Sequence, residues 1–300
     1  MNCLRPLLYF SIFQHPLKLE EIHLFSDNPT LETTKNQLEQ AILDGILKKQ
    51  EDFYLSSEVS YKSIKRRKEE NEFAKLAMQK AFRRAKFIHK YFPFVRGVGI
   101  SGSLSKGRFN SDADADFFII TSKNSLWTCR TLLIAFKKIF LLNSKKFFCV
   151  NYFITDKALE IEEKNRFTAT ELVTLIPVTN QALFNKFYQK NQWAKDFYPN
   201  QSLYVDELEQ PNSVLKRFLE YLFKPQTFFS EWLFKTITTK FWSKKFSHLS
   251  ETEKKVAFKS SKNISKHHPD NYQKKVIDEL NKKYHRYSKK FNIKFEQEYA

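Results

Sequence analysis

One short stretch of the chain holds most of its glycines and three regularly spaced aspartates. Four of the five glycines lie between Gly97 and Gly107, and Asp112, Asp114 and Asp116 follow at alternate positions. Glycine tolerates positive φ, and successive backbone N–H groups in a glycine-rich turn can bind an anion. Carboxylates at alternate positions of an extended segment share one face. A phosphate-binding turn beside clustered carboxylates indicates metal-assisted phosphoryl or nucleotidyl transfer.

The elements expected around this stretch would place the turn and the aspartates at neighbouring strand ends. We predict strands over 98–101, 114–121 and 147–154, a strand over 159–162 that forms a hairpin with the last of these, and a helix over 126–142. Chemistry alone leaves the aspartate pair open, because Asp112 with Asp114 shares a face as well as Asp114 with Asp116 does.

Over residues 96–165, the order of these motifs resembles the nucleotidyltransferase superfamily of the DNA polymerase β type. That family carries Gly-Ser after a first strand and Asp-x-Asp at the start of a second, apolar strand. Gly102-Ser103 and Asp114-Ala-Asp116 stand in those places here. The resemblance implies that Asp114 and Asp116 are catalytic ligands of two Mg²⁺ ions. It also implies that Gly102 and Ser103 hold the terminal phosphates of ATP or another NTP.

The resemblance extends to basic residues and to a third acidic position. Lys106 and Arg108 are expected to neutralise triphosphate charge, and Arg130 in the following helix is a weaker candidate for the same role. The family adds a third carboxylate on a later strand, and Asn151 occupies that position in this chain. Glu160 is the acid that we predict to take over this catalytic role.

The implied activity is the transfer of NMP from an NTP to a hydroxyl acceptor, with release of pyrophosphate. The alternative is a catalytically inactive regulator that binds a nucleotide or nucleic acid, which the amide of Asn151 favours. The chain has 51 Lys and Arg against 33 Asp and Glu, a net charge of +18. This charge predicts polyanionic partners, so RNA or another anionic acceptor is expected, although a general lysine-rich composition would give the same excess.

The whole chain is predicted to be α+β, with a small mixed-sheet core at 61–165, led by a basic helix over 61–92, and a helical region at 166–300. Residues 1–60 read as three helices followed by two short strands, which resembles a winged helix-turn-helix. DNA binding through this module is only weakly indicated, because the helix that would read bases has no arginine and two acids. A packing or dimerisation module is the favoured interpretation.

The last third of the chain is rich in amphipathic patterns. Helices are predicted at 213–224 and 227–246, and the second is heavy in Phe and Trp with lysine edges, which fits core packing better than an interfacial membrane helix. The lysine-rich tail, 253–300, reads as helical with a loop at His267-His268-Pro269. No apolar run is long enough for a transmembrane segment, no signal peptide is evident, and three scattered cysteines exclude a zinc or disulfide framework. We therefore expect a cytoplasmic protein.

Overall fold

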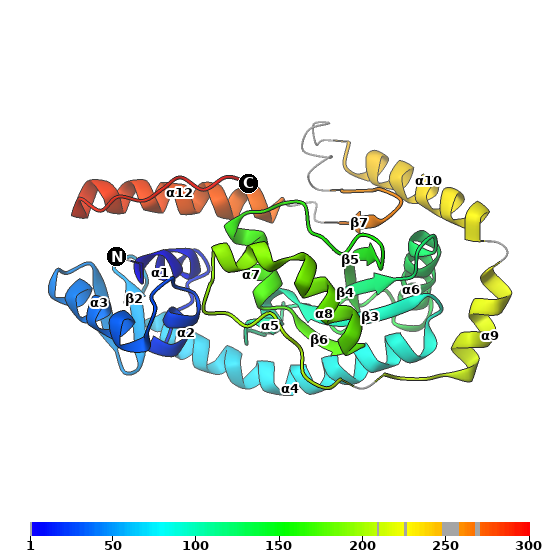
Figure 1. Ribbon diagram of the computed structural model, residues 1–300, viewed down its shortest axis with the longest axis horizontal. Helices are drawn as coiled ribbons and strands as arrows, with labels where there is room; N and C mark the ends of the chain where they lie inside the picture. Colours follow the sequence, from blue (N-terminus) through cyan, green and yellow to red (C-terminus); the bar gives the residue numbers. More distant parts are fainter. Residues whose placement is uncertain (1, 209, 225–226, 248–257, 268–270) are drawn as a thin grey trace.

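The computed structural model describes residues 2–208, 210–224, 227–247, 258–267 and 271–300. The fold is α+β, as predicted, with one five-stranded mixed sheet and a separate two-stranded hairpin among the described residues. Figure 1 shows an elongated molecule in which the N-terminal elements lie at one end and the sheet lies nearer the other.

The N-terminal module has three helices and a hairpin, in the predicted order. The Thr30 hydroxyl caps the third helix by accepting a hydrogen bond from Thr33 N at 3.0 Å, and Gly45 follows the helix with φ +69°. The resemblance of this module to a winged helix stays a prediction. Its elements are α1 (Leu4–Ser11), α2 (Leu19–Leu24), α3 (Leu31–Leu43), β1 (Leu47–Gln50) and β2 (Phe53–Ser56).

A single helix of 30 residues, α4 (Lys62–Tyr91), connects this module to the sheet and confirms the helix predicted over 61–92. At 1.5 Å per residue it is about 45 Å long. Figure 1 shows it running along both the module and the sheet. Its buried face toward the sheet recurs every three to four positions and is mostly alanine, which allows close approach: Ala74, Ala77, Ala81, Ala85 and Ile88.

The five-stranded sheet has the order β6-β3-β4-β5-β7. Strands β4 and β5 are parallel and are joined by helix α6 (Leu126–Phe140), whereas the other neighbouring pairs are antiparallel. Asp116, the first residue of β4, lies opposite Ser101 on one side and Cys149 on the other. The end of β3 and the starts of β4 and β5 therefore lie side by side. We call this border of the sheet, across the strand ends, its edge. The strands are β3 (Val95–Ser101), β4 (Asp116–Thr121), β5 (Cys149–Thr155), β6 (Ile176–Thr179) and β7 (Ile264–Lys266).

Two predictions about the sheet are wrong. Residues 159–162 form no strand, and the second neighbour of β5 is β7, with Ile264 opposite Ile154. The chain beyond residue 167 is not helical throughout, because β6 and β7 both come from it. Both strands are too short to show a period of two, and β6 contains Pro177, which an edge strand tolerates. Pairing with distant strands, rather than local sequence, makes these segments extended.

The remaining helices are α7 (Arg166–Val173), α8 (Gln181–Lys190), a 3₁₀ turn (Gln192–Asp196), α9 (Val214–Phe223), α10 (Thr227–Lys245) and α12 (Tyr272–Phe291). Helices α9 and α10 confirm the predictions at 213–224 and 227–246. The predicted helical tail is helical only in α12 among its described residues. Its segments 253–257 and 268–270, with His268 and Pro269 of the predicted loop, lie outside the described residues. No helix in the described part of the chain is long and apolar enough to cross a membrane.

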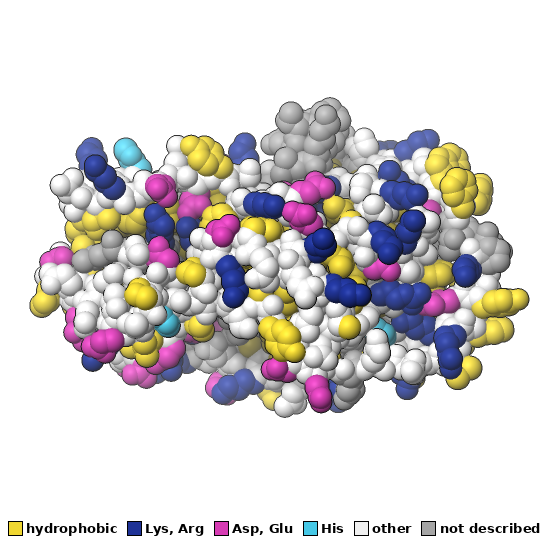
Figure 2. Space-filling model, viewed as in Figure 1, with side chains coloured by type: hydrophobic (Ala, Val, Ile, Leu, Met, Phe, Trp, Pro, Cys, Tyr) yellow, Lys and Arg dark blue, Asp and Glu magenta, His cyan; other side chains and the backbone are white. Residues whose placement is uncertain are grey.

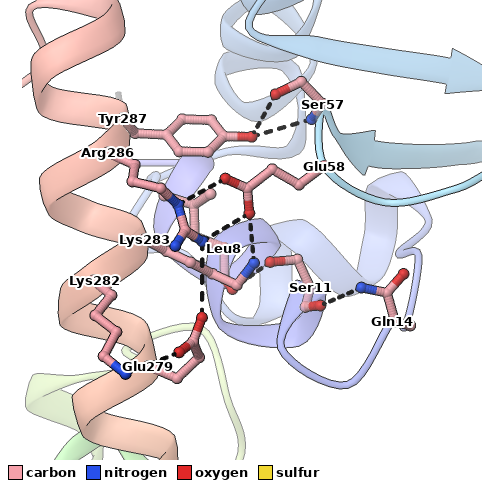
Figure 3. Close-up of polar contacts among 10 residues, drawn as sticks. All are labelled: Leu8, Ser11, Gln14, Ser57, Glu58, Glu279, Lys282, Lys283, Arg286 and Tyr287. Atoms are coloured by element: carbon pink, nitrogen blue, oxygen red, sulfur yellow. Dashed lines mark hydrogen bonds and ion pairs between the residues drawn. The ribbon is translucent and has the colours of Figure 1, made fainter.

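Helix α12 packs against the N-terminal module through a polar cluster (Figure 3). The Glu58 carboxylate accepts hydrogen bonds from Lys283 Nζ at 2.7 Å and from Arg286 Nε and Nη2 at 3.0 Å each. The Tyr287 hydroxyl accepts a hydrogen bond from Ser57 N at 3.1 Å. The last helix of the chain therefore anchors the first module to the body of the protein.

Candidate active site

The glycine turn follows β3 directly, and its first glycine lies against an aspartate. Gly102 has φ +73°, and a Cβ added to it would lie 2.4 Å from Asp116 Oδ2. Any side chain at this position would meet both backbone strain and a clash with the carboxylate. Gly102 is therefore required for the Asp116 carboxylate to sit against the main chain of the turn.

Asp116 is held in a largely buried and electronegative environment. Its pKa is raised to about 6, mainly by burial and also by the charges of Asp114 and Glu171, while a hydrogen bond with the Cys149 side chain and the charge of Lys106 oppose the rise. The Asn151 amide Nδ2 lies 3.4 Å from Asp116 Oδ1. The negative charge of Asp116 is thus poorly compensated by its neighbours, and a cation bound beside it would relieve this imbalance.

The structure separates the three aspartates of the motif. Strand β4 begins only at Asp116, so the expected strand start at Asp114 is wrong by two residues and the aspartates do not form one extended face. Asp114 is half-buried and close enough to raise the pKa of Asp116. Asp112 is exposed, and its N–H donates to Asn110 Oδ1 at 3.0 Å within a local turn. Of the two pairs left open by the sequence, Asp114 with Asp116 is the one whose charges interact.

Asn151 and Glu160 lie at opposite ends of β5. Asn151 sits where the register between β4 and β5 shifts, and the irregularity leaves its amide beside Asp116. Glu160 follows the far end of the strand, whose seven residues alone span roughly 20 Å. Its exposed carboxylate pairs with Lys164 Nζ at 2.9 Å. The structure therefore does not bring Glu160 to the aspartate pair.

The two predicted phosphate-binding cations are at the turn, and each is paired with an acid. Lys106 Nζ donates to Gly102 O at 3.0 Å and to Glu171 Oε1, on α7, at 2.8 Å. Arg108 Nε donates to Glu70 Oε2, on α4, at 2.8 Å. A triphosphate would have to compete with these carboxylates for both cations. Glu70 and Glu171 come from helices outside the motif, and no local pattern marks them as partners.

Ser103 and Arg130 have very different surroundings. Ser103 is half-buried beside Gly102, and its hydroxyl makes no hydrogen bond within the part of the chain that the structure describes. It is free to bind a ligand. Arg130 is buried on α6, with its guanidinium 4.7 Å from the ring centre of Trp242, and burial lowers its pKa to about 10. The structure therefore does not place Arg130 at the glycine turn.

The donor atoms at this edge fit Mg²⁺. The carboxylates of Asp114 and Asp116 are hard oxygen ligands, and Mg²⁺ usually takes one or two carboxylates and completes its shell with water and phosphate. Among the described residues, no group of three or more His, Cys, Asp or Glu side chains is arranged to hold a metal ion. Substrate phosphates would therefore supply much of the coordination of Mg²⁺. The ion would in turn neutralise the negative charge of Asp116.

A basic hollow of about 300 Å³ lies along α4, which packs on the face of the sheet opposite to α7 and α8. It is lined by Lys80, Arg83, Arg84, Phe87 and Phe147. Lys80 Nζ lies 5.4 Å from the ring centre of Phe147, two residues before β5. That ring in turn stacks on Phe109 of the glycine turn at 5.6 Å. The basic residues of this helix are evident from the sequence, whereas the aromatic ring that Phe147 adds beside them comes from a distant segment that only the fold brings there.

No protein-family model matches the chain, and no curated protein or solved structure matches it either.

Proposed function

We propose that the protein is a Mg²⁺-dependent nucleotidyltransferase that moves NMP from an NTP to a hydroxyl acceptor. The observation that carries this proposal is the contact between the Asp116 carboxylate and the main chain of Gly102, because it joins an anion-binding turn to a carboxylate pair. In the reaction, the acceptor oxygen forms a bond to the α-phosphorus and the bond to the bridging oxygen breaks. Pyrophosphate leaves, and the acceptor hydroxyl loses its proton.

Each residue at this edge has a chemical task in this proposal. Asp114 and Asp116 would hold Mg²⁺, which when bound neutralises phosphate charge and orients the reacting oxygens. The backbone of the turn and the Ser103 hydroxyl would hold the terminal phosphates. Lys106 can join them by exchanging its bond to Glu171 for one to a phosphate oxygen.

The acceptor proton needs a carboxylate, because an amide such as that of Asn151 cannot accept it. Within the described part of this edge, the carboxylates include those of Asp114, Asp116, Glu171 and Glu70.

The basic hollow favours an anionic acceptor such as RNA. Its three cations provide attraction for phosphates, and its two aromatic rings provide surfaces on which a base can stack. Phe147 in the hollow also stacks on Phe109, two residues after Gly107. The proposal of an anionic acceptor therefore rests on the hollow rather than on the carboxylates.

Pyrophosphate release tests the activity. The protein is incubated with Mg²⁺ and each of the four NTPs, with and without bulk RNA. We expect the Asp114→Asn/Asp116→Asn variant to lose release by at least about 100-fold, because both metal ligands lose their charge. Asp112→Asn is the matched control and should retain it, since Asp112 is exposed and outside the pair. Undiminished release by the double variant would contradict the proposal.

A second function, a nucleotide-binding regulator without turnover, is favoured by Asn151 and by the acids already paired with Lys106 and Arg108. It predicts no pyrophosphate release from any mixture but a higher unfolding temperature with Mg²⁺ and an NTP, lost in the double aspartate variant. DNA binding through residues 1–60, which would extend this regulatory role, stays a prediction.

A further inference from the structure

Helix α9 directs its apolar face toward the solvent. Val214, Leu215, Phe218, Tyr221 and Leu222 recur at helical spacing on one side of the helix, and all are exposed, Tyr221 by 77 %. A helix on the surface of a globular protein normally buries such a face. The exposed side of α9 is therefore not explained by the packing of this chain.

The buried side of α9 carries its charges. Lys216 is only 7 % exposed, and its Nζ donates to the carbonyl oxygens of His89 and Val95 at 2.7 and 2.6 Å. Glu220 accepts hydrogen bonds from Phe94 N and from Arg96 Nη1, both at 2.7 Å. These contacts fix the orientation of the helix, because turning it over would break every one of them.

The start of α10, at the same end of the molecule, also exposes apolar side chains (Figure 1). Phe228, 89 % exposed, with Phe229 and Trp232, follows directly after α9 in the chain. Farther along, Phe234 and Trp242 pack in the core, and Trp242 lies 6.2 Å from Trp127, ring centre to ring centre. Ile237 and Phe241 are exposed, so the core packing predicted for this segment holds for one face of the helix only. We call the eight exposed apolar residues of α9 and the start of α10 the α9–α10 surface.

The charges around the α9–α10 surface are almost all positive. Residues 213–246 contain seven Lys and Arg and two acids. Both acids are engaged inside the fold, because Glu220 binds Arg96 and Glu231 caps α6 by accepting from Trp127 N and Thr128 N. Arg217 and Lys240 are exposed. Figure 2 shows hydrophobic and basic side chains together at the end of the molecule where Figure 1 places α9 and α10.

We propose that the α9–α10 surface docks onto the surface of an anionic lipid bilayer. Exposed Phe, Trp, Tyr and Leu side chains beside Lys and Arg are the combination that binds the interface of such a bilayer, through apolar burial and attraction to acidic headgroups. A second copy of the chain fits less well, because a symmetric contact would bring one positive rim against another. The occupant that complements both the apolar side chains and their charge is an anionic membrane.

Docking would leave the candidate active site accessible. Glu220 holds Phe94 and Arg96 at the start of β3, whereas Gly102 follows its last residue. The seven residues of the strand place the two regions roughly 20 Å apart. Membrane binding is therefore independent of the proposed transferase activity, and each can fail without the other.

Vesicle flotation tests the docking. The full chain is mixed with vesicles of phosphatidylcholine, or of phosphatidylcholine and phosphatidylglycerol in equal parts, and recovered from a density gradient. We expect flotation with the anionic vesicles only. The variant Phe218→Ser/Tyr221→Ser/Phe229→Ser should bind at least about 100-fold more weakly, because three large apolar side chains no longer enter the interface.

The matched control places the same change on exposed apolar residues elsewhere, as Leu43→Ser/Phe73→Ser/Leu76→Ser. It should float like the unmodified protein, and thermal unfolding of both variants should stay close to that of the parent because the replaced side chains are exposed. No flotation of the parent would overturn the proposal. Equal binding by all three proteins would also overturn it, because the net charge of +18 alone would then account for adsorption. A dimer in sedimentation velocity that dissociates in the α9–α10 variant, without flotation, would assign the surface to a second copy instead.

Discussion

Helices α9 and α12 both carry apolar residues at intervals of three to four positions, but α12 buries these residues whereas α9 exposes them to solvent. In α12, Val276, Leu280 and Tyr287 are buried against the N-terminal module. In α9, Phe218 and Tyr221 face the solvent while Lys216 is buried. An amphipathic pattern thus predicts the helix but not the side that packs, since the available partners decide which face is covered.

The largest expected effect compares the two apolar faces. Leu280→Ala removes a fully buried side chain of α12 and should lower the free energy of unfolding by roughly 2–5 kcal/mol. Phe218→Ala removes an exposed side chain of α9 and should change it by less than about 0.5 kcal/mol. Denaturant unfolding of the two variants measures the difference. Equal losses would mean that the exposed face of α9 is covered in solution.

A smaller effect is expected at the buried charge of α9. Lys216→Met leaves the carbonyl oxygens of His89 and Val95 without their donor and should cost about 1–3 kcal/mol at neutral pH. The pKa of Lys216 is lowered to about 8, mainly by burial and also by the charge of Arg96, while the charge of Glu220 opposes the shift.

The sign of the pH dependence follows from this lowered pKa. Between pH 8 and the ordinary lysine pKa of 10.5, the unfolded chain keeps the proton of Lys216 and the folded chain loses it. The stability of the parent relative to Lys216→Met should therefore rise with pH across this window, by up to about 1.4 kcal/mol per pH unit. Arg217→Met, an exposed neighbour, is the control and should show no such slope. A parallel response of the parent and Lys216→Met would contradict the burial of this charge.

The smallest effect is expected at the polar contact of α12. Burial of Glu58 opposes its ionisation, but hydrogen bonds from Lys283 and Arg286 outweigh it and lower its pKa (Figure 3). The contribution of Glu58 is thus present above its ordinary pKa of 4.5 and is lost as the pH falls below it. Glu58→Gln should destabilise the fold by less than about 1 kcal/mol at pH 7, because the cluster is partly exposed to solvent. The difference from the parent, measured by thermal unfolding, should vanish in acid; a constant difference would exclude this linkage.

The candidate site shows the same division between local pattern and tertiary contact. The glycine turn, the apolar strand after the aspartates and the place of Asn151 near them were predictable, although the strand begins two residues later than expected, because each depends on a few consecutive residues or on adjacent strands. The acids that pair with Lys106 and Arg108 were not, because Glu171 and Glu70 come from two helices that only the fold brings to the turn. Glu160 failed to reach the site because its expected hairpin does not form.

The sequence by itself determined where helices and turns form. Periodic apolar residues, the Thr30 cap and the positive φ that glycine permits at Gly102 act within one or two helical turns or one tight turn. The tertiary structure alone decided the strands β6 and β7, the partners of the cations at the turn and the outward face of α9. The reason is physical: strand pairing and ion pairing join residues that are far apart in the chain, and the burial of a face depends on what lies opposite it.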